Sequence, residues 1–236
     1  MDVDIVCVGF GPATGGFLTT LSKNLLKEDG TPVVESQAMP GMPPQVICYE
    51  RADDVGFGVS GVVTPARRIK ASFPQLDPAQ IPMAAPVKSE KVAYLLDPIG
   101  ASRRSLALRS ADVVLKLFKG KDHAIELPWI PPFLAKHDGL VLSMGQFMQW
   151  VGAQAMGSGT VQVWPSTPAS SALVEDKKVV GVRLIDQGVE KNGTPTGAFT
   201  PGMDIRAALT VIGDGPVGAL GQQLGQIIAE QKDLRD

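Results

Sequence analysis

Cysteine and histidine are scarce in this chain, which has two of each among 236 residues. Two cysteines cannot supply the four thiolates of an iron–sulfur cluster or a structural zinc site, and they exclude a disulfide framework. His123 and His137 have no acidic or cysteine companions at ligand spacing, so we expect no metal site. Cys7 and Cys48 each lie within an apolar run, where we expect small buried side chains. This cysteine usage is typical of a reducing, cytoplasmic setting.

Long apolar runs and an excess of either charge are also missing. No stretch reaches the roughly 18 consecutive apolar residues of a membrane span, and the acidic start of the chain is unlike a secretory signal. Lys and Arg total 22 against 24 Asp and Glu, so the chain lacks the basic surface that nucleic-acid recognition needs. With 44% apolar and 19% charged residues, the composition is that of a globular protein with one large domain or two small ones.

A glycine-rich turn near the start carries the first functional signal. Val3–Val8 predicts a buried strand of a parallel sheet, and residues 9–16 (GFGPATGG) lead from it into apolar positions at helical spacing up to about Lys27. Strand, glycine turn and helix in this order are typical of dinucleotide binding. The first glycine permits the sharp turn, and Gly11 lets a pyrophosphate approach the backbone at the helix N-terminus. Thr14 stands where this motif usually has its third glycine.

An acidic residue after the next strand completes the motif. Residues 46–49 predict that strand, and Glu50 follows it, with Arg51 next. We expect Glu50 to accept hydrogen bonds from the ribose hydroxyls of an adenosine group. Its distance from the glycine turn is nearly double the usual gap of about 20 residues, because residues 28–45, rich in glycine and proline, interrupt the pattern as an inserted loop. The alternative for Glu50 is an ordinary solvated side chain at a strand end.

A second strand, glycine turn and helix occur near the other end. Residues 205–212 predict a buried strand that leads into Gly213–Gly218, and a helical pattern follows. In flavoproteins with two such motifs, the Gly-Asp turn holds the ribityl and pyrophosphate groups of FAD. Asp214 would accept hydrogen bonds from ribityl hydroxyls, and the next helix N-terminus would face phosphate. The two motifs together indicate FAD rather than NAD, although this turn alone is also consistent with a plain loop.

The middle of the chain is less informative. Residues 92–118 hold a predicted strand and then a segment that is either a strand or an amphipathic helix. Leu127–Leu134 is apolar and punctuated by proline, so it is either a packed loop, the commoner outcome, or an exposed contact with a membrane or hydrophobic ligand. Residues 144–156 predict a helix capped by Ser143. From residue 161 onward the pattern predicts a three-stranded β-meander and a final strand.

These stretches, taken together, resemble the FAD domain of the electron-transfer flavoprotein–ubiquinone oxidoreductase family. The resemblance rests on residues 2–16, on 46–63 with its Ser60-Gly61 step, on 127–156 with Trp150, and on 189–218. It implies a non-covalently bound FAD, a flavoprotein as electron donor and a quinone as acceptor. It also implies contact with the bilayer through Leu127–Leu134. The quinone and cluster domains of the family lie beyond the shared stretch, so the chain is expected to be truncated relative to full-length members.

We therefore expect an α/β fold, namely a Rossmann-like FAD-binding domain of the glutathione-reductase type with an accessory β-meander and a small inserted region. Residues 1–65 and 140–236 would form the core of a single FAD-binding unit, with 66–139 inserted. The expected function is an FAD-dependent oxidoreductase module, cytoplasmic or peripheral to a membrane, with no assigned catalytic residue. The alternatives are a subunit completed by a partner chain, or a flavin reductase or hydroxylase of the geranylgeranyl-reductase-like type. The expected cofactor-binding residues are Gly9, Gly11, Pro12, Ala13, Thr14, Glu50, Arg51, Ser60, Gly61, Asp214 and Gly215.

Overall fold

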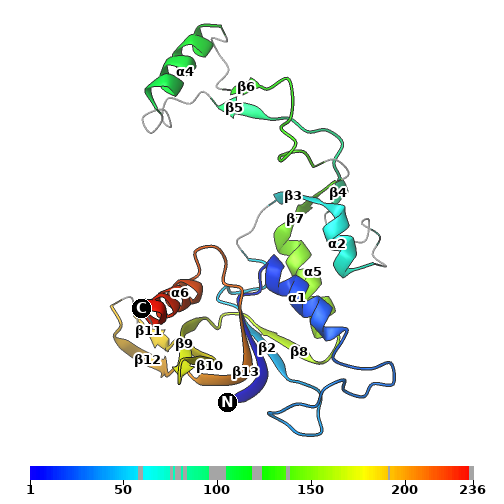
Figure 1. The fold of residues 1–236 in the computed structure, drawn as a ribbon, viewed down its shortest axis with the longest axis vertical. Coiled ribbons are helices and arrows are strands. Elements are labelled where there is room, and N and C mark those ends of the chain that lie inside the picture. Colours follow the sequence, from blue (N-terminus) through cyan, green and yellow to red (C-terminus); the bar gives the residue numbers. More distant parts are fainter. Residues whose placement is uncertain are drawn as a thin grey trace. The chain divides into compact units, whose positions relative to one another are not determined.

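The computed structural model describes residues 1–57, 61–74, 77, 81, 84–95, 105–118, 124–136, 139–190 and 192–233. The chain divides into two compact units (Figure 1). Unit 1 comprises Met1–Val62, Arg67–Ala84 and Leu142–Asp236, and unit 2 comprises Val63–Ala66 and Ala85–Val141. The segment expected to be inserted, 66–139, stays a prediction, but the contacts group residues 67–84 with unit 1.

A six-stranded sheet with the order β8-β2-β1-β13-β10-β9 forms the centre of unit 1. Its parallel strands are β8 (Val161–Trp164), β2 (Val46–Tyr49), β1 (Asp2–Val8) and β13 (Asp204–Ile212). β1 and β2 are mostly buried, whereas β8 and β13 are partly exposed. The burial predicted for residues 205–212 is therefore wrong at most positions, and of these only Ile205 is buried. Because the four strands run the same way, their carboxyl ends meet at one edge, where the glycine turns and Glu50 follow.

Two helices pack together beside this sheet (Figure 1). They are α1 (Pro12–Ser22) and α5 (Met144–Met156). A Cβ atom on Gly15 of α1 would lie 2.7 Å from Met148 Cε of α5, so glycine permits the close approach of the helices. α1 ends earlier than its sequence pattern predicts. The hydroxyls of Thr19 and Thr20 donate to the carbonyls of Gly15 and Gly16 within the helix, and the Asn24 amide donates to Thr20 O near its end.

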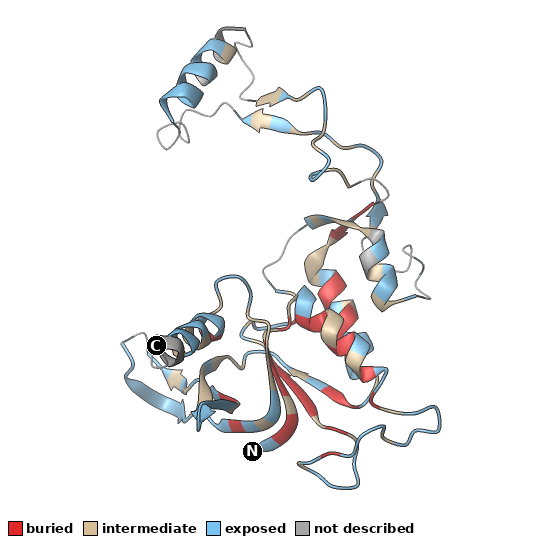
Figure 2. Ribbon diagram, viewed as in Figure 1, coloured by how far each residue is buried: buried red, intermediate tan, exposed pale blue. Residues whose placement is uncertain are grey.

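A third helix, α6 (Ala219–Asp233), packs against the far part of the sheet. Ala172 of β9 donates its backbone N–H to Gln223 Oε1 of α6 at 3.0 Å. Leu220 is 2% exposed and joins Val6, Ile47 and Val182 in a buried apolar cluster. Buried residues run along the central strands and the two helices α1 and α5 (Figure 2).

The β-meander expected from residue 161 onward is wrong in its first strand. Residues 161–164 are not its first strand, because β8 pairs in parallel with β2 and α5 provides the crossover. The antiparallel part consists of β9 (Ala169–Glu175) and β10 (Lys178–Leu184), and β10 also pairs with β13. A separate two-stranded sheet contains β11 (Gln187–Val189) and β12 (Pro195–Thr200).

A buried carboxylate anchors the loop between α1 and β2, which the sequence predicts as an insertion. Asp4 of β1 accepts hydrogen bonds from Ser36 Oγ and from the backbone N–H groups of Gln37, Ala38 and Gln45, at 2.6 to 3.2 Å. Burial raises the pKa of Asp4, but these hydrogen bonds outweigh burial and hold the pKa below its ordinary value. The loop is thus tied to the first strand.

Unit 2 and its borders hold short elements. A three-stranded sheet contains β3 (Gly61–Pro65), β7 (Gly139–Ser143) and β4 (Ala85–Pro86), and α2 (Ala66–Ser72) follows β3. β5 (Ala93–Leu95) pairs with β6 (Ala124–Glu126). The segment left open between strand and helix is the helix α4 (Leu106–Phe118).

The burial expected for Leu127–Leu134 is wrong for most of its large side chains. Trp129 is 60% exposed, Phe133 79% and Leu134 44%, while Ile130 is partly buried. The prolines at 128, 131 and 132 prevent regular structure here. The neighbouring strands β5 and β6 are only three residues long, too short to cover these side chains.

Candidate functional site

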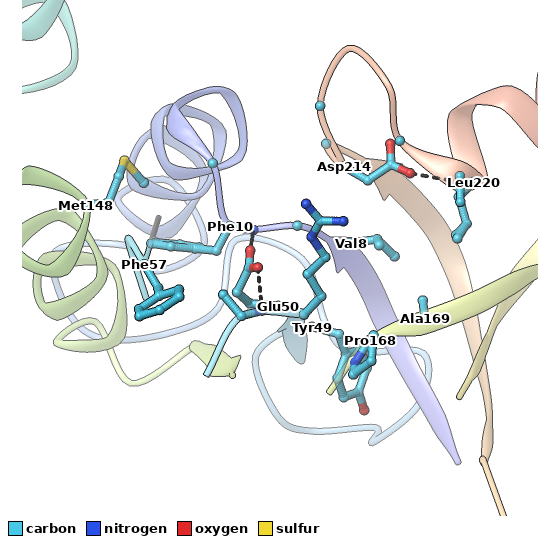
Figure 3. A pocket seen from close by; sticks show the side chains of 18 of the residues that line it. Val8, Phe10, Tyr49, Glu50, Phe57, Met148, Pro168, Ala169, Asp214 and Leu220 are labelled. Atoms are coloured by element: carbon cyan, nitrogen blue, oxygen red, sulfur yellow. Dashed lines mark hydrogen bonds between the residues drawn. The ribbon is translucent and has the colours of Figure 1, made fainter. Parts of the chain in front are cut away.

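A cavity of about 750 Å³ lies at the carboxyl ends of β1, β2 and β13, within the size range of small-molecule sites. It is formed by both glycine turns, the segment after β2 and parts of α5 and α6 (Figure 3). In an open α/β sheet, this edge is where ligands bind. The lining residues are Val8, Gly9, Phe10, Gly11, Pro12, Tyr49, Glu50, Arg51, Ala52, Gly56, Phe57, Met148, Pro168, Ala169, Gly213, Asp214, Gly215, Gly218, Ala219 and Leu220.

The first turn presents an open helix N-terminus to this cavity. Gly11 is the N-cap of α1, no side chain caps this end, and the first turn has no acidic residue. Pro12 occupies the first helical turn, where its missing N–H costs nothing. A Cβ atom on Gly11 would meet no atom within 4 Å, so space for a ligand lies directly over the backbone. This end of α1 is therefore suited to an anionic group.

Glu50 faces the same turn. Its Oε2 accepts the backbone N–H of Phe10 at 2.6 Å, and its Oε1 accepts the N–H of Ala52 at 2.9 Å (Figure 3). The carboxylate is partly buried and retains acceptor positions, because an ionised carboxylate has about four. Glu50 thus orders the glycine turn in addition to lining the cavity.

The second turn differs from the first because an acidic side chain lies at the N-terminus of the helix that follows it. Asp214 Oδ2 accepts the backbone N–H of Leu220 at 2.9 Å (Figure 3), so its carboxylate already caps the N-terminus of α6. A Cβ atom on Gly218 would clash with this carboxylate, which explains the glycine there. The expectation that the N-terminus of α6 faces a phosphate stays a prediction. The Asp214 carboxylate already lies at this helix end.

The two turns contact each other through their backbones. The N–H of Gly213 donates to Val8 O at 2.8 Å, and the N–H of Gly9 donates to Tyr49 O at 2.8 Å. Gly9 has a φ of +84°, and a Cβ atom there would lie 2.6 Å from Gly213 O. Only glycine fits this position, on both backbone and steric grounds. The two turns consequently form one continuous surface of the cavity.

The structure brings seven of the predicted residues together around the cavity. Ala13, Thr14 and Gly61 do not line it, and Ser60 lies outside the described residues. Thr14 instead lies buried behind the turns, at 2% exposure. The seven residues are Gly9, Gly11, Pro12, Glu50, Arg51, Asp214 and Gly215.

Several lining residues were missed by sequence reasoning. Gly56 has a φ of +79°, and a Cβ atom on it would clash with Gly145 O of α5. Phe57, next to it, is 69% exposed, and Met148 lies on the buried side of α5. Glycines at 56 and 58, within a stretch expected near the ligand, were a usable signal for this close approach. Pro168 and Ala169 carried no signal, because tertiary folding alone places β9 beside the cavity.

The buried thiols of Cys7 and Cys48, next to the site, are unreactive. Cys7 and Cys48 are neighbours in the β1–β2 register, and both are fully buried and free. Burial raises the pKa of Cys7 to about 12 and also raises that of Cys48, so neither forms a nucleophilic thiolate at neutral pH. Among the described residues, no group of three His, Cys, Asp or Glu side chains is arranged to hold a metal ion. Within the same residues, no helix is long and apolar enough to cross a membrane.

The predicted fold class is supported by solved structures. A geranylgeranyl bacteriochlorophyll reductase-like protein from Thermoplasma acidophilum superposes with a TM-score of 0.54 at 18% identity, covering 95% of this chain and 42% of that one. The THI4 protein of Thermovibrio ammonificans gives a TM-score of 0.50 at 13% identity, covering 95% of this chain and 62% of that one. The expectation of a Rossmann-like α/β fold is confirmed.

Curated sequences give a second comparison, whereas no family model matches the chain. An electron transfer flavoprotein-ubiquinone oxidoreductase of Pseudomonas aeruginosa is 28% identical over 229 residues, covering 95% of this chain and 35% of the relative. The mitochondrial enzyme of the same name from Caenorhabditis elegans is 29% identical over 236 residues, covering 98% of this chain and 32% of the relative. The chain spans about one third of the length of these relatives. Its resemblance to the electron transfer flavoprotein-ubiquinone oxidoreductases is therefore confirmed over nearly the whole of its own length.

Proposed function

We propose that this chain binds FAD non-covalently in the cavity and acts as a flavin-dependent oxidoreductase module. One observation carries the proposal: a single cavity is lined by the glycine turn after β1, by Glu50 after β2 and by the Gly-Asp turn after β13. A mononucleotide needs only one of these turns, whereas a dinucleotide of two linked nucleotides can contact both. The names of the sequence relatives agree with a flavin-linked redox function.

The residues present fit a dinucleotide. The uncapped N-terminus of α1 and the open space over Gly11 suit a pyrophosphate. Glu50 has free acceptor capacity for ribose hydroxyls, and the next residue, Arg51, supplies a cation to the lining of the cavity. Asp214 keeps one carboxylate oxygen beyond the one that caps α6, so it can also accept from hydroxyls.

The bound flavin would supply the electron transfer itself. The protein's residues hold and surround it: Glu50 orders the glycine turn, Asp214 orders the start of α6, and Phe57 and Met148 provide apolar lining. No side chain at this cavity is required to donate or accept a proton in flavin electron transfer, so we assign no catalytic acid or base.

An absorbance spectrum of the purified protein, before and after incubation with FAD and desalting, tests the proposal. Retained flavin bands, with NAD failing to compete, would support it, whereas a colourless protein after incubation would refute it. Gly11→Val places a side chain in the open space over the turn and should abolish retention. Gly16→Ala is the matched control, because a Cβ atom there also meets nothing within 4 Å but Gly16 does not line the cavity.

For the partners, we propose an electron transfer flavoprotein as donor and a quinone as acceptor, reached at a membrane surface. The names of the relatives motivate the first two. The exposure of Trp129 and Phe133 supports peripheral binding, because exposed aromatic side chains insert at the bilayer interface. Co-sedimentation with quinone-containing vesicles tests this: Trp129→Ala with Phe133→Ala should release the protein, and Phe199→Ala, at an exposed aromatic of unit 1, should not. Equal binding by all variants would refute the membrane role of this segment.

A second candidate is a subunit completed by a partner chain. It is favoured by Leu209, which is 49% exposed on β13 in the central sheet, and by Ile228, which is 55% exposed on α6. Light scattering after size-exclusion chromatography distinguishes the candidates, because a monomer that retains flavin would contradict the need for a partner. A flavin reductase acting on an apolar substrate would instead show substrate-dependent bleaching of the flavin.

A further inference from the structure

Thr14 occupies an unusual place between the two turns. It lies in the first turn of α1 and is 2% exposed. A Cβ atom on Gly213 would clash with Thr14 Oγ1 and would lie 3.4 Å from Thr14 Cβ. Gly213 does not have a positive φ, so its backbone conformation is open to any residue. The space that the Thr14 hydroxyl fills is therefore what excludes a side chain at Gly213.

The hydroxyl of Thr14 is not used as the other hydroxyls of α1 are. Thr19 and Thr20 donate to the carbonyls of Gly15 and Gly16, four residues earlier, at 2.7 and 2.9 Å. Thr14 Oγ1 is buried and has no hydrogen-bond partner. Leaving a buried hydroxyl unpaired is unfavourable, so hydrogen bonding within the protein does not explain why a threonine occupies position 14. The size of its side chain and its contact with Gly213 do explain it.

The position of Thr14 links the parts that a dinucleotide must contact. Gly213 is held to the end of β1 by its hydrogen bond to Val8 O, and Asp214 follows it directly. Thr14 lies in the first turn of α1, behind the glycine turns and against Gly213, and it does not line the cavity. Its contact with Gly213 therefore sets how closely the second turn approaches the first.

We propose that Thr14 is a positioning residue that sets the spacing of the two turns, and so determines whether a ligand that contacts both can bind. This inference rests on the proposed function. A ligand that uses only the first turn and Glu50 should be insensitive to Thr14, whereas a ligand that spans both turns should depend on it.

The test compares two probes, ADP and FAD, by calorimetry on the full chain. Thr14→Ala removes the hydroxyl and methyl, and should weaken FAD binding at least about tenfold, which is about 1.4 kcal/mol, while changing ADP binding less than about twofold. Thr20→Ala is the matched control, because it makes the same substitution in the same helix at an exposed hydroxyl, and Thr20 does not line the cavity. Equal weakening of both probes, or no weakening of FAD, would overturn the proposal.

A second variant pair keeps the proposal testable if single changes impair folding. Gly213→Ala alone should lower both thermal stability and FAD affinity, because its methyl meets the Thr14 hydroxyl. The double variant Thr14→Ala with Gly213→Ala removes the Thr14 hydroxyl that the new methyl group on residue 213 would meet. The two Cβ atoms then lie 3.4 Å apart. It should recover most of the stability and FAD affinity lost in Gly213→Ala. Additive losses would contradict a shared contact.

The outcomes separate this inference from the proposed function. A wild-type chain that binds ADP but not FAD would refute the proposed function. In that case, the recovery of thermal stability in the double variant would still report on the contact itself. A wild-type chain that binds FAD, with variants that bind it equally well, would refute only the role of Thr14.

Discussion

Glu50 Oε2 accepts the backbone N–H of Phe10 at 2.6 Å. The acidic residue that completes the dinucleotide motif is thus bonded to the glycine turn that begins it, although 40 positions separate them. Because Oε1 also accepts the N–H of Ala52, one carboxylate joins the carboxyl ends of β1 and β2. Its role in the protein is structural, in addition to the ligand-binding role that we propose for it.

This double role predicts the behaviour of Glu50→Gln. The amide keeps the size of the side chain but turns one acceptor into a donor, which opposes an N–H group. We expect a loss of about 1–3 kcal/mol in the free energy of unfolding, together with reduced FAD retention. Urea unfolding and flavin absorbance measure the two effects. Glu28→Gln, in the exposed loop, is the control, and a fully stable Glu50→Gln protein would contradict the structural role.

Asp214 is expected to act as a helix cap. Asp214→Ala removes the acceptor for the Leu220 N–H and should lower the free energy of unfolding by about 1 kcal/mol. Asp214→Asn retains a cap and should lose little stability. If both variants lose FAD affinity to the same extent while only the alanine variant loses stability, the carboxylate charge is shown to matter to the ligand separately from the cap.

Asp4 predicts a dependence of stability on acid. Its folded pKa lies below its ordinary value of 3.8, so its stabilising contribution is complete above pH 3.8 and is lost as the pH falls through the folded pKa. Thermal unfolding measured across this range should show the loss. Asp4→Asn should be less stable at neutral pH and should show a flatter acid limb. An unchanged acid limb in that variant would assign the loss to other carboxylates.

Gly56 and Gly41 form a matched pair for backbone strain. Both have a positive φ, +79° and +85°, but only a Cβ atom on Gly56 would clash, with Gly145 O. Gly41→Ala should cost about 1–2 kcal/mol from conformation alone. Gly56→Ala should cost more than Gly41→Ala and should also reduce FAD retention, because Gly56 lines the cavity. Equal costs in chemical denaturation would mean that α5 moves away readily.

The buried thiols predict slow modification. Because burial raises the pKa of Cys7 to about 12 and raises that of Cys48, a thiol-specific reagent should label neither in the folded protein at neutral pH. Both should react at once in denaturant. The raised pKa of Cys7 also means that its contribution to stability is complete below the ordinary value of 9.0 and is lost as the pH rises toward 12. Rapid labelling of the native chain would contradict the burial.

Local patterns in the sequence predicted the elements that carry the site. The apolar runs before Gly9 and Gly213 are strands, and the helix after Ser143 begins and ends where its pattern indicates. The parallel order of those strands was implied by the glycine turns, because strand, turn and helix units cross over in one sense. The fourth parallel strand, β8, was assigned to the meander because a four-residue strand has the same local pattern in a meander and in a parallel sheet.

By itself, the sequence determined that the chain has two glycine turns and an acidic residue after the second strand, since these depend only on neighbours along the chain. Only the tertiary structure decided that Glu50 bonds to Phe10, that Asp214 caps α6 and that Thr14 fits against Gly213. The physical reason is that these contacts join residues brought together by strand pairing and close packing, which no local periodicity encodes. For the same reason, the apolar character of Trp129 and Phe133 did not predict that they are exposed.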